Sequence, residues 1–198
     1  MSRSERQYGP SVFPPMPRLE TERLILRPMC LYDAKSIRRL ANDPIVSDTL
    51  EMPHPYEEGV AEDWIMGQPD GWRERGELFL LITNKENRVS MGSTSLFIDV
   101  KNRKAEFGYW LGTEYWGYGY ATEAAEAIIE FGFLTLGLNR MEGYHLARNP
   151  KSGRVLQKLG FQKEGCLRKS FSKNGLFEDM VVNGLLKSEY LALKSKEV

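Results

Sequence analysis

A pair of glycines precedes a segment with helical spacing, and this combination could bind an anion. The run Trp116-Gly-Tyr-Gly-Tyr-Ala-Thr122 leads into small and apolar residues that recur every three or four positions, namely Ala121, Ala124, Ala125, Ile128 and Ile129. This spacing predicts a helix that begins near Tyr120. The first turn of a helix has N–H groups without partners and a partial positive charge, and glycine lets a phosphate approach without meeting a Cβ atom. A pyrophosphate would fit there, although plain turn chemistry is the alternative interpretation of the same spacing.

Two common phosphate motifs do not match this run. A P-loop has a lysine and then a serine or threonine after its last glycine, whereas Tyr120 and Ala121 follow Gly119. The dinucleotide fingerprint has a third glycine or alanine and an acidic residue at the end of the next strand, and neither is present. Nucleoside triphosphate chemistry and hydride transfer therefore lose support.

Glu106 is a candidate for proton transfer. It lies in a predicted strand on the face opposite to Ala105 and Phe107. A carboxylate in a cleft could relay a proton from an incoming amine through water, and burial would raise its pKa toward useful values. A solvated or ion-paired strand glutamate is the alternative.

Other polar residues have simpler interpretations. Asn149 followed by Pro150 is suited to start a helix, with the asparagine as N-cap. The basic residues Arg148, Lys151, Arg154 and Lys158 predict a solvated helix face, with contact to phosphates as the alternative. His54 and His145 are isolated and no cysteines are paired, so no metal site is expected.

The composition is that of a soluble globular domain. The chain has 198 residues, and its 27 Lys and Arg balance 27 Asp and Glu, so no basic field is available for nucleic acid or an anionic membrane. A flexible, proline-rich tail (residues 1–17) and a single domain (residues 18–198) are expected.

Cys30 and Cys166 lie far apart without a secretory segment, which predicts free thiols and a cytoplasmic location. No apolar run approaches the roughly 20 residues that span a bilayer.

The apolar patterns predict alternating strands and helices that would position these residues. Strands are expected at 21–28, 78–83, 89–100, 104–112, 140–147, 161–171 and 177–186, and helices at 34–42, 57–68, from Tyr120 and at 150–159. Asp33 is a candidate N-cap, and Asn174-Gly175 predicts a hairpin turn. The fold class is α/β (α+β), a mixed sheet flanked by helices. The strands at 104–112 and 140–147 could run parallel on either side of the helix from Tyr120, which would put a ligand at their carboxyl ends.

Four stretches together resemble the GNAT-type N-acetyltransferases, in the ribosomal-protein acetyltransferase (RimJ/RimL-like) branch. They are Glu22-Arg-Leu-Ile-Leu-Arg-Pro28, Ala105-Glu-Phe-Gly-Tyr-Trp-Leu-Gly112, Trp116-Gly-Tyr-Gly-Tyr-Ala-Thr-Glu123 and Asn149-Pro-Lys-Ser-Gly-Arg-Val-Leu-Gln-Lys-Leu-Gly-Phe161. The resemblance implies a GNAT-like, mostly antiparallel, splayed sheet that binds acetyl-CoA as co-substrate in its cleft. Trp116 departs from the superfamily pattern, which usually has Gln or Arg there, but backbone amides do not depend on that side chain.

The resemblance also assigns expected roles. The cofactor-binding residues would be Trp110, Leu111, Trp116, Gly117, Tyr118, Gly119, Tyr120, Ala121, Thr122, Asn149 and Ser152, with the main chain of the strand pairing the pantetheine amides. Glu106 would be catalytic, because related enzymes frequently have an acidic residue at this place. Ser152 would also be catalytic, because the tyrosine acid of many relatives is replaced here by Leu156 and the RimL-like pattern has a serine at the place of Ser152. Tyr109 and Trp110 are otherwise ordinary core aromatics.

The expected reaction is direct transfer, in which a neutral amine attacks the thioester while main-chain N–H groups stabilise the oxyanion. At pH 7, deprotonation costs about 1.4 kcal/mol for an α-amine and roughly 4.6 kcal/mol for a lysine. An α-amine is therefore the easier acceptor. The resemblance likewise implies a protein N-terminal α-amine, with a small-molecule amine as the other acceptor that relatives use. A coenzyme-binding sensor or scaffold without turnover is the alternative, and the oligomeric state stays open, a homodimer included.

Overall fold

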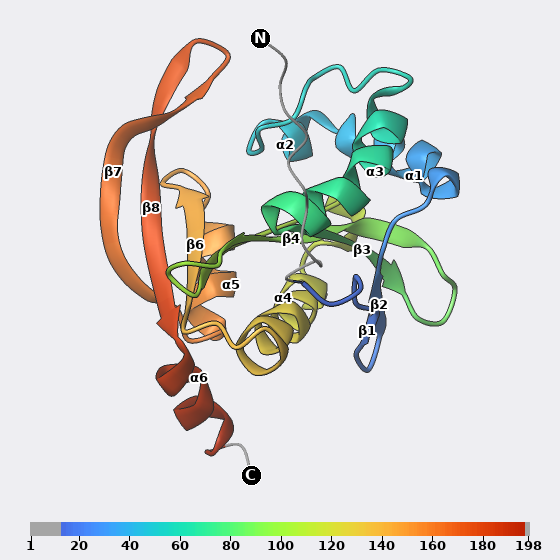
Figure 1. Cartoon of the computed structure of the whole chain (residues 1–198). Helices are drawn as coiled ribbons and strands as arrows, with labels where there is room; N and C mark the ends of the chain where they lie inside the picture. Colours follow the sequence, from blue (N-terminus) through green and yellow to red (C-terminus); the bar gives the residue numbers. More distant parts are fainter. Residues whose placement is uncertain (1–12, 197–198) are drawn as a thin grey trace, which may run out of the picture.

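One open sheet, in the order β1-β2-β3-β4-β5-β6-β8-β7, organises the computed structural model, which describes residues 13–196 (Figure 1). Its strands are β1 (Leu19–Glu20), β2 (Leu24–Arg27), β3 (Glu77–Asn84), β4 (Ser90–Asp99), β5 (Lys104–Leu111), β6 (Arg140–Leu146), β7 (Gln162–Lys173) and β8 (Leu176–Leu186). The helices are α1 (Ala34–Ala41), α2 (Pro44–Ser47), α3 (Val60–Asp70), α4 (Tyr120–Glu130), α5 (Pro150–Lys158) and α6 (Lys187–Lys194). The predicted mixed, mostly antiparallel sheet flanked by helices is confirmed.

The parallel pair β5 and β6 is the feature that shapes the molecule. The ladder between them begins at Lys104 opposite Arg140 and ends at Phe107 opposite Gly143. Beyond that point β5 continues to Leu111 beside β4, and β6 continues to Leu146 beside β8. The predicted parallel pairing is confirmed, and the sheet splits into two halves at the carboxyl ends of these central strands, as the family resemblance implied.

Alternating apolar residues let helices cover both faces of the sheet. Leu78, Leu80 and Ile82 of β3 belong to the larger core, which also contains the inner face of α4, whereas Leu81 packs with the inner residues of α1 and α3. Ala124, Ala125, Ile128 and Ile129 of α4 are at most 1% exposed, which accounts for the helical spacing seen in the sequence.

Several elements differ from the predictions. β1, α2 and α6 were not predicted, since each is very short or lacks a strong apolar period. The second helix runs further than expected, because a π-helical turn (Gly71–Arg75) continues α3 past Pro69. Asp33 does precede α1, but its carboxylate accepts hydrogen bonds from Arg27 and from the backbone of Cys30, so it does not cap the helix through its side chain.

The N-terminal tail was predicted over residues 1–17, of which 1–12 lie outside the described residues. Phe13 packs on Trp72, with ring centroids 4.5 Å apart, and the indole N–H of Trp72 donates to the carbonyl of Pro14 at 2.7 Å. The short turn at Asn174-Gly175 joins β7 to β8 with positive φ at both residues, as expected for the hairpin. Within residues 13–196, no helix is long and apolar enough to cross a membrane.

Candidate active site

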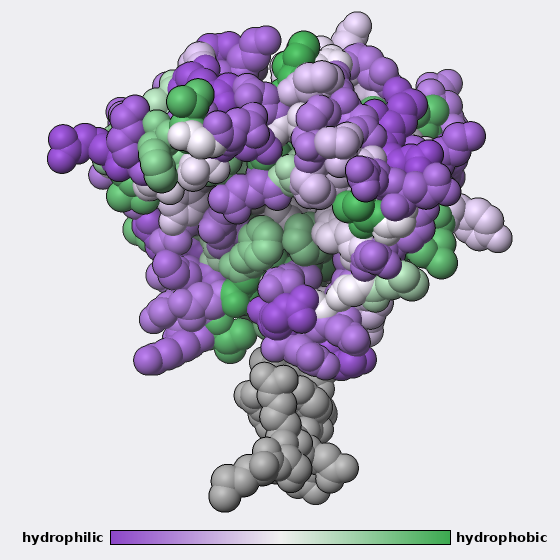
Figure 2. Space-filling model, turned by 90° about the horizontal axis from the view of Figure 1, so that it is seen from above, coloured by the Kyte–Doolittle hydropathy of each residue, from purple (hydrophilic) through white to green (hydrophobic). Residues whose placement is uncertain are grey.

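A cleft of about 1370 Å³ opens where β5 and β6 separate. Its walls come from the end of β5, the turn before α4, the start of α5, the end of β6 and the segment after α2. Pockets for single small ligands typically measure roughly 300–1,000 Å³, so this cleft has room for two substrates. Seen from above, the surface is mostly hydrophilic with an apolar area near its centre (Figure 2).

The glycine turn has the conformation that the sequence predicted. Gly117 and Gly119 have φ of 85° and 84°, in the left-handed region that favours glycine, and α4 begins at Tyr120. No side chain caps this helix, and within residues 13–196 the backbone N–H groups of Tyr120, Ala121 and Thr122 have no acceptor. Together with the helix dipole, these free amides make this corner suited to bind an anion.

The predicted cofactor residues converge on the cleft, with one exception. Those that line it are Trp110, Leu111, Trp116, Gly117, Gly119, Tyr120, Ala121, Thr122, Asn149 and Ser152. Tyr118 does not line it; its side chain is 65% exposed and its carbonyl accepts a hydrogen bond from Arg23 at 3.0 Å.

Arg23 holds the glycine turn from behind. Its guanidinium lies 2.6 Å from the Glu123 carboxylate, in the first turn of α4, and 4.6 Å from the ring centroid of Tyr120. Burial would raise the pKa of Glu123, but hydrogen bonds from Thr21 and Arg23 keep that pKa below its ordinary value. Arg23 thus neutralises the Glu123 carboxylate. The partial positive charge at the start of α4 therefore stays available to a ligand. Sequence reasoning missed this contact, which spans about a hundred positions.

Helix α5 brings Ser152 to Tyr109. Asn149 acts as the predicted N-cap, with its Oδ1 accepting from the Ser152 backbone N–H at 3.3 Å. The Tyr109 hydroxyl donates to Ser152 Oγ at 3.4 Å. Burial raises the pKa of Tyr109, and the hydrogen bond to Ser152 offsets part of that rise. Strand alternation indicated which face Tyr109 occupies, but no local signal in the sequence indicated its partner on α5.

Glu106 opens onto the cleft without an ion pair in the described part of the chain. The Glu106 side chain is exposed to the cleft, but the protein around it removes part of its water. This desolvation, followed by the negative charges of Glu142 and Glu51, raises the pKa of Glu106 above its ordinary value. A carboxyl group with a raised pKa is better matched to taking a proton near neutral pH than an ordinary glutamate is.

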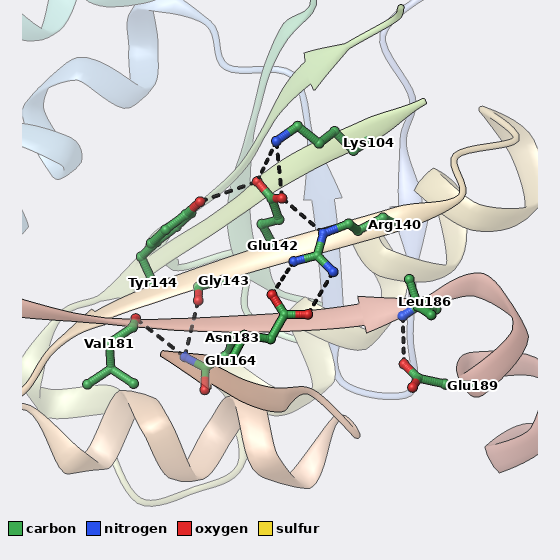
Figure 3. Close-up of polar contacts among 10 residues, drawn as sticks. All are labelled: Lys104, Arg140, Glu142, Gly143, Tyr144, Glu164, Val181, Asn183, Leu186 and Glu189. Carbon is green, nitrogen blue, oxygen red and sulfur yellow. Dashed lines mark hydrogen bonds and ion pairs between the residues drawn. The ribbon is translucent and has the colours of Figure 1, made fainter. Parts of the chain in front are cut away.

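The neighbouring Glu142 has a different environment, shown in Figure 3. It faces Glu106 across the β5–β6 ladder and accepts from Lys104 at 3.0 Å, from Arg140 at 2.9 Å and from the Tyr144 hydroxyl at 3.2 Å. Burial would raise the pKa of Glu142, but the hydrogen bonds from Arg140 and Lys104 keep it below its ordinary value. Arg140 also pairs with Glu164, so the network ties β5, β6 and β7 together where the sheet is still closed.

Residues 48–53, here called the strap, connect the two halves of the sheet across the cleft. Arg148, from the loop after β6, donates to the Asp48 carboxylate at 2.5 Å and to its carbonyl at 3.0 Å. Lys173 at the end of β7 donates to the carbonyls of Leu50 at 2.7 Å and Met52 at 3.3 Å. The strap follows α2, so these contacts hold it across one end of the cleft.

Basic side chains line the other wall. Lys151, Arg154 and Lys158 of α5 all border the cleft, and the Lys151 ammonium lies 5.2 Å from the ring centroid of Trp116. His145 borders it as well, with Nδ1 3.0 Å from the carbonyl of Leu146. In residues 13–196, no group of three or more His, Cys, Asp or Glu side chains is arranged to hold a metal ion.

Comparison with known proteins agrees with this geometry. A family model described as an acetyltransferase (GNAT) domain matches residues 23–162. A Bacillus licheniformis protein named an uncharacterized N-acetyltransferase is 36% identical over 176 residues, covering 88% of this chain and 99% of that protein. A Bacillus subtilis protein provisionally named a ribosomal N-acetyltransferase is 34% identical over 152 residues, covering 76% of each.

A solved structure shares the fold. The spermidine N-acetyltransferase from Vibrio cholerae, in complex with CoA and spermine, superposes with a TM-score of 0.75 at 24% identity, covering 86% of this chain and 99% of that one. The splayed sheet is therefore an arrangement common to both proteins.

Proposed function

Because the chain belongs to the GNAT family of acetyltransferases, as its motifs predicted, we propose that it moves an acetyl group from acetyl-CoA to a primary amine by direct attack. It is an acyltransferase, and the observation that most supports this reaction is the split between β5 and β6 beside the unpartnered amides of α4. An activated acyl group is what acetyl-CoA supplies, so no enzyme nucleophile is needed.

Three features of the cleft fit the parts of coenzyme A. The free N–H groups of Tyr120, Ala121 and Thr122 suit its diphosphate. Beyond Phe107, the edge of β5 that faces β6 has no paired strand among the described residues, and it suits the amides of the pantetheine arm in the manner of an added strand. The cations of α5 suit a further phosphate. The fit of the first two features to coenzyme A depends on backbone geometry, and the fit of the third depends on charge.

Glu106 would act as the general base, directly or through a water molecule. A raised pKa means that Glu106 is protonated, and inactive as a base, at low pH and becomes active as the pH rises through that pKa. Ser152 would protonate the departing thiolate, with Tyr109 hydrogen-bonded behind it to replace the proton. Since a thiol has a pKa of about 8.5, this leaving group needs only weak acid assistance.

The acceptor would be a protein N-terminal α-amine or a small-molecule amine. The lower cost of deprotonation at pH 7, about 1.4 kcal/mol against roughly 4.6 kcal/mol, favours an α-amine over a lysine side chain. The names of the two relatives, ribosomal N-acetyltransferase and spermidine N-acetyltransferase, support amine acceptors of either origin. Membership of the RimJ/RimL-like branch and a homodimer are part of this proposal. So is a cytoplasmic location, which the two free cysteines suit.

The test is an acceptor screen with the purified full chain and acetyl-CoA. Thiol release, followed with a chromogenic disulfide, should depend on a primary amine, and mass spectrometry should find one acetyl group added to that amine. Tight binding of acetyl-CoA on calorimetry with no thiol release for any amine would instead support a coenzyme sensor and contradict the proposal.

A further inference from the structure

The acceptor end of the cleft contains a largely buried serine whose hydroxyl has no partner among residues 13–196. Ser95 of β4 lies opposite Gly108 of β5, is 7% exposed and borders the cleft. Its hydroxyl makes no hydrogen bond within residues 13–196, whereas neighbouring Ser93 donates to the Leu80 carbonyl at 3.1 Å. The Ser95 hydroxyl is not one of the fully buried polar atoms without a partner, so it is open to the cleft and can bind a polar group of a ligand there.

Gly108 keeps that hydroxyl accessible. A Cβ atom at position 108 would lie 2.8 Å from Ser95 Oγ, closer than real contacts allow. The missing side chain therefore leaves a hollow on the sheet between Glu106 and Trp110, on the face that all three residues share. A small polar group of a substrate, such as an amine, can reach both Glu106 and Ser95 there.

An aromatic row borders the same hollow. The rings of Trp64 and Phe79 meet edge to face with centroids 5.3 Å apart, and those of Phe79 and Phe97 with centroids 5.4 Å apart. All three side chains line the cleft, and Val60 and Met52 lie beside them. Such a surface favours an apolar or aromatic body, since burying it there removes hydrocarbon from water and adds ring contacts.

The charges that line the two ends of the cleft have opposite signs. The cations Lys151, Arg154 and Lys158 all come from α5, whereas Glu51 of the strap and Glu106 lie at the acceptor end. The charge of Glu51 acts on Glu106. A carboxylate beside the reacting amine would be repelled by both glutamates, so a free amino acid fits this end poorly.

We propose that the acceptor is a primary amine carried by an aromatic or branched apolar group, with no carboxylate next to the amine. This inference rests on the proposed function and names its substrate class. The amine would lie at Glu106 and Ser95, and its apolar body would lie on the row Trp64–Phe79–Phe97. The same chemistry is offered by a free arylalkylamine and by a peptide whose first residue is aromatic.

The experiment compares kcat/KM across matched amines with the full chain. The probes are 2-phenylethylamine, phenylalanine, spermidine and two short peptides. The two peptides differ only in their first residue, which is Phe in one and Gly in the other. We expect kcat/KM for 2-phenylethylamine or for the Phe peptide to exceed the values for phenylalanine, spermidine and the Gly peptide by about tenfold or more. Whichever of 2-phenylethylamine and the Phe peptide has the higher kcat/KM identifies the source of the amine. A preference for spermidine, the Gly peptide or phenylalanine would overturn this inference while leaving amine acetylation intact. Acetyl-CoA binding without transfer to any amine would overturn both.

Two variants test the subsite itself. Phe97 is 41% exposed, so Phe97→Ala should fold and should raise KM for the preferred aromatic substrate about tenfold, with KM for acetyl-CoA unchanged. Phe177→Ala removes an exposed ring outside the cleft and serves as its control.

Glu51→Gln should lower the ratio of kcat/KM for 2-phenylethylamine to kcat/KM for phenylalanine about threefold. Glu57→Gln, outside the cleft lining, should leave this ratio unchanged. Unchanged KM for Phe97→Ala or an unchanged ratio for Glu51→Gln would contradict the proposal.

Discussion

The two ends of the cleft are built in different ways. The end proposed for the coenzyme depends on main-chain groups: the amides at the start of α4 and the free edge of β5. The end proposed for the acceptor depends on side chains from elements far apart in sequence, including the strap, α3, β3 and β4. A main-chain site tolerates substitutions at most positions, whereas a side-chain site can change its ligand through single substitutions. This contrast fits two relatives that are named for different acceptors, a ribosomal N-acetyltransferase and a spermidine N-acetyltransferase.

The largest effect is expected at Gly119, one of the few positions where the main-chain site does not tolerate a side chain. Gly119→Glu places a side chain at φ 84° and a negative charge at the helix end, so acetyl-CoA should bind about 100-fold more weakly or worse on calorimetry. Gly175→Glu is the matched control, because Gly175 has φ 77° in an open hairpin outside the cleft lining. Equal affinity of Gly119→Glu and the parent chain would remove the proposed phosphate corner.

Replacement of Glu106 should separate chemistry from coenzyme binding. Near neutral pH, Glu106→Gln should lower kcat/KM for the amine about 100-fold, and the loss should shrink as the pH rises and the amine deprotonates unaided. In the parent chain, the acid limb of the pH–rate profile should lie above the range of an ordinary glutamate, because burial and the charges of Glu142 and Glu51 raise this pKa. Acetyl-CoA affinity should not change. A variant with the parent's pH profile would show that Glu106 is not the base.

A smaller effect is expected from the residue that holds the glycine turn. Arg23→Ala removes the ion pair to Glu123 and the hydrogen bond to the Tyr118 carbonyl, so acetyl-CoA should bind about threefold to tenfold more weakly. Arg18→Ala is the control, since Arg18 pairs with Glu20 on the surface. If both variants bind acetyl-CoA alike, Arg23 does not position the turn.

The smallest effect should appear at the strap and should be confined to the acceptor. Lys173→Met removes the hydrogen bonds to Leu50 and Met52, which should raise KM for the amine about threefold and leave acetyl-CoA affinity unchanged. Lys163→Met, on the exposed part of β7, is the control. A change in coenzyme affinity instead of amine KM would contradict the division of the cleft into two ends.

The same contrast explains what the sequence could predict. Local spacing identified the start of α4 and the glycine turn, because each depends on residues close together in the chain. The parallel pair β5 and β6 was predicted from the order strand, helix, strand. The contact of Tyr109 with Ser152 and the row Trp64–Phe79–Phe97 depend on how distant elements pack, and no local pattern indicates them. Asp33 was mistaken for a side-chain cap because its partner, Arg27, lies on another element.

The most direct test of the main-chain site follows the backbone amides of Tyr120, Ala121 and Thr122. Their N–H groups lack protein acceptors in the described residues, so their amide resonances should shift and their hydrogen exchange should slow when acetyl-CoA is added. Amides at the Asn174-Gly175 turn should not respond. If the three amides at the start of α4 stay unchanged while acetyl-CoA binds elsewhere, the coenzyme site is wrong.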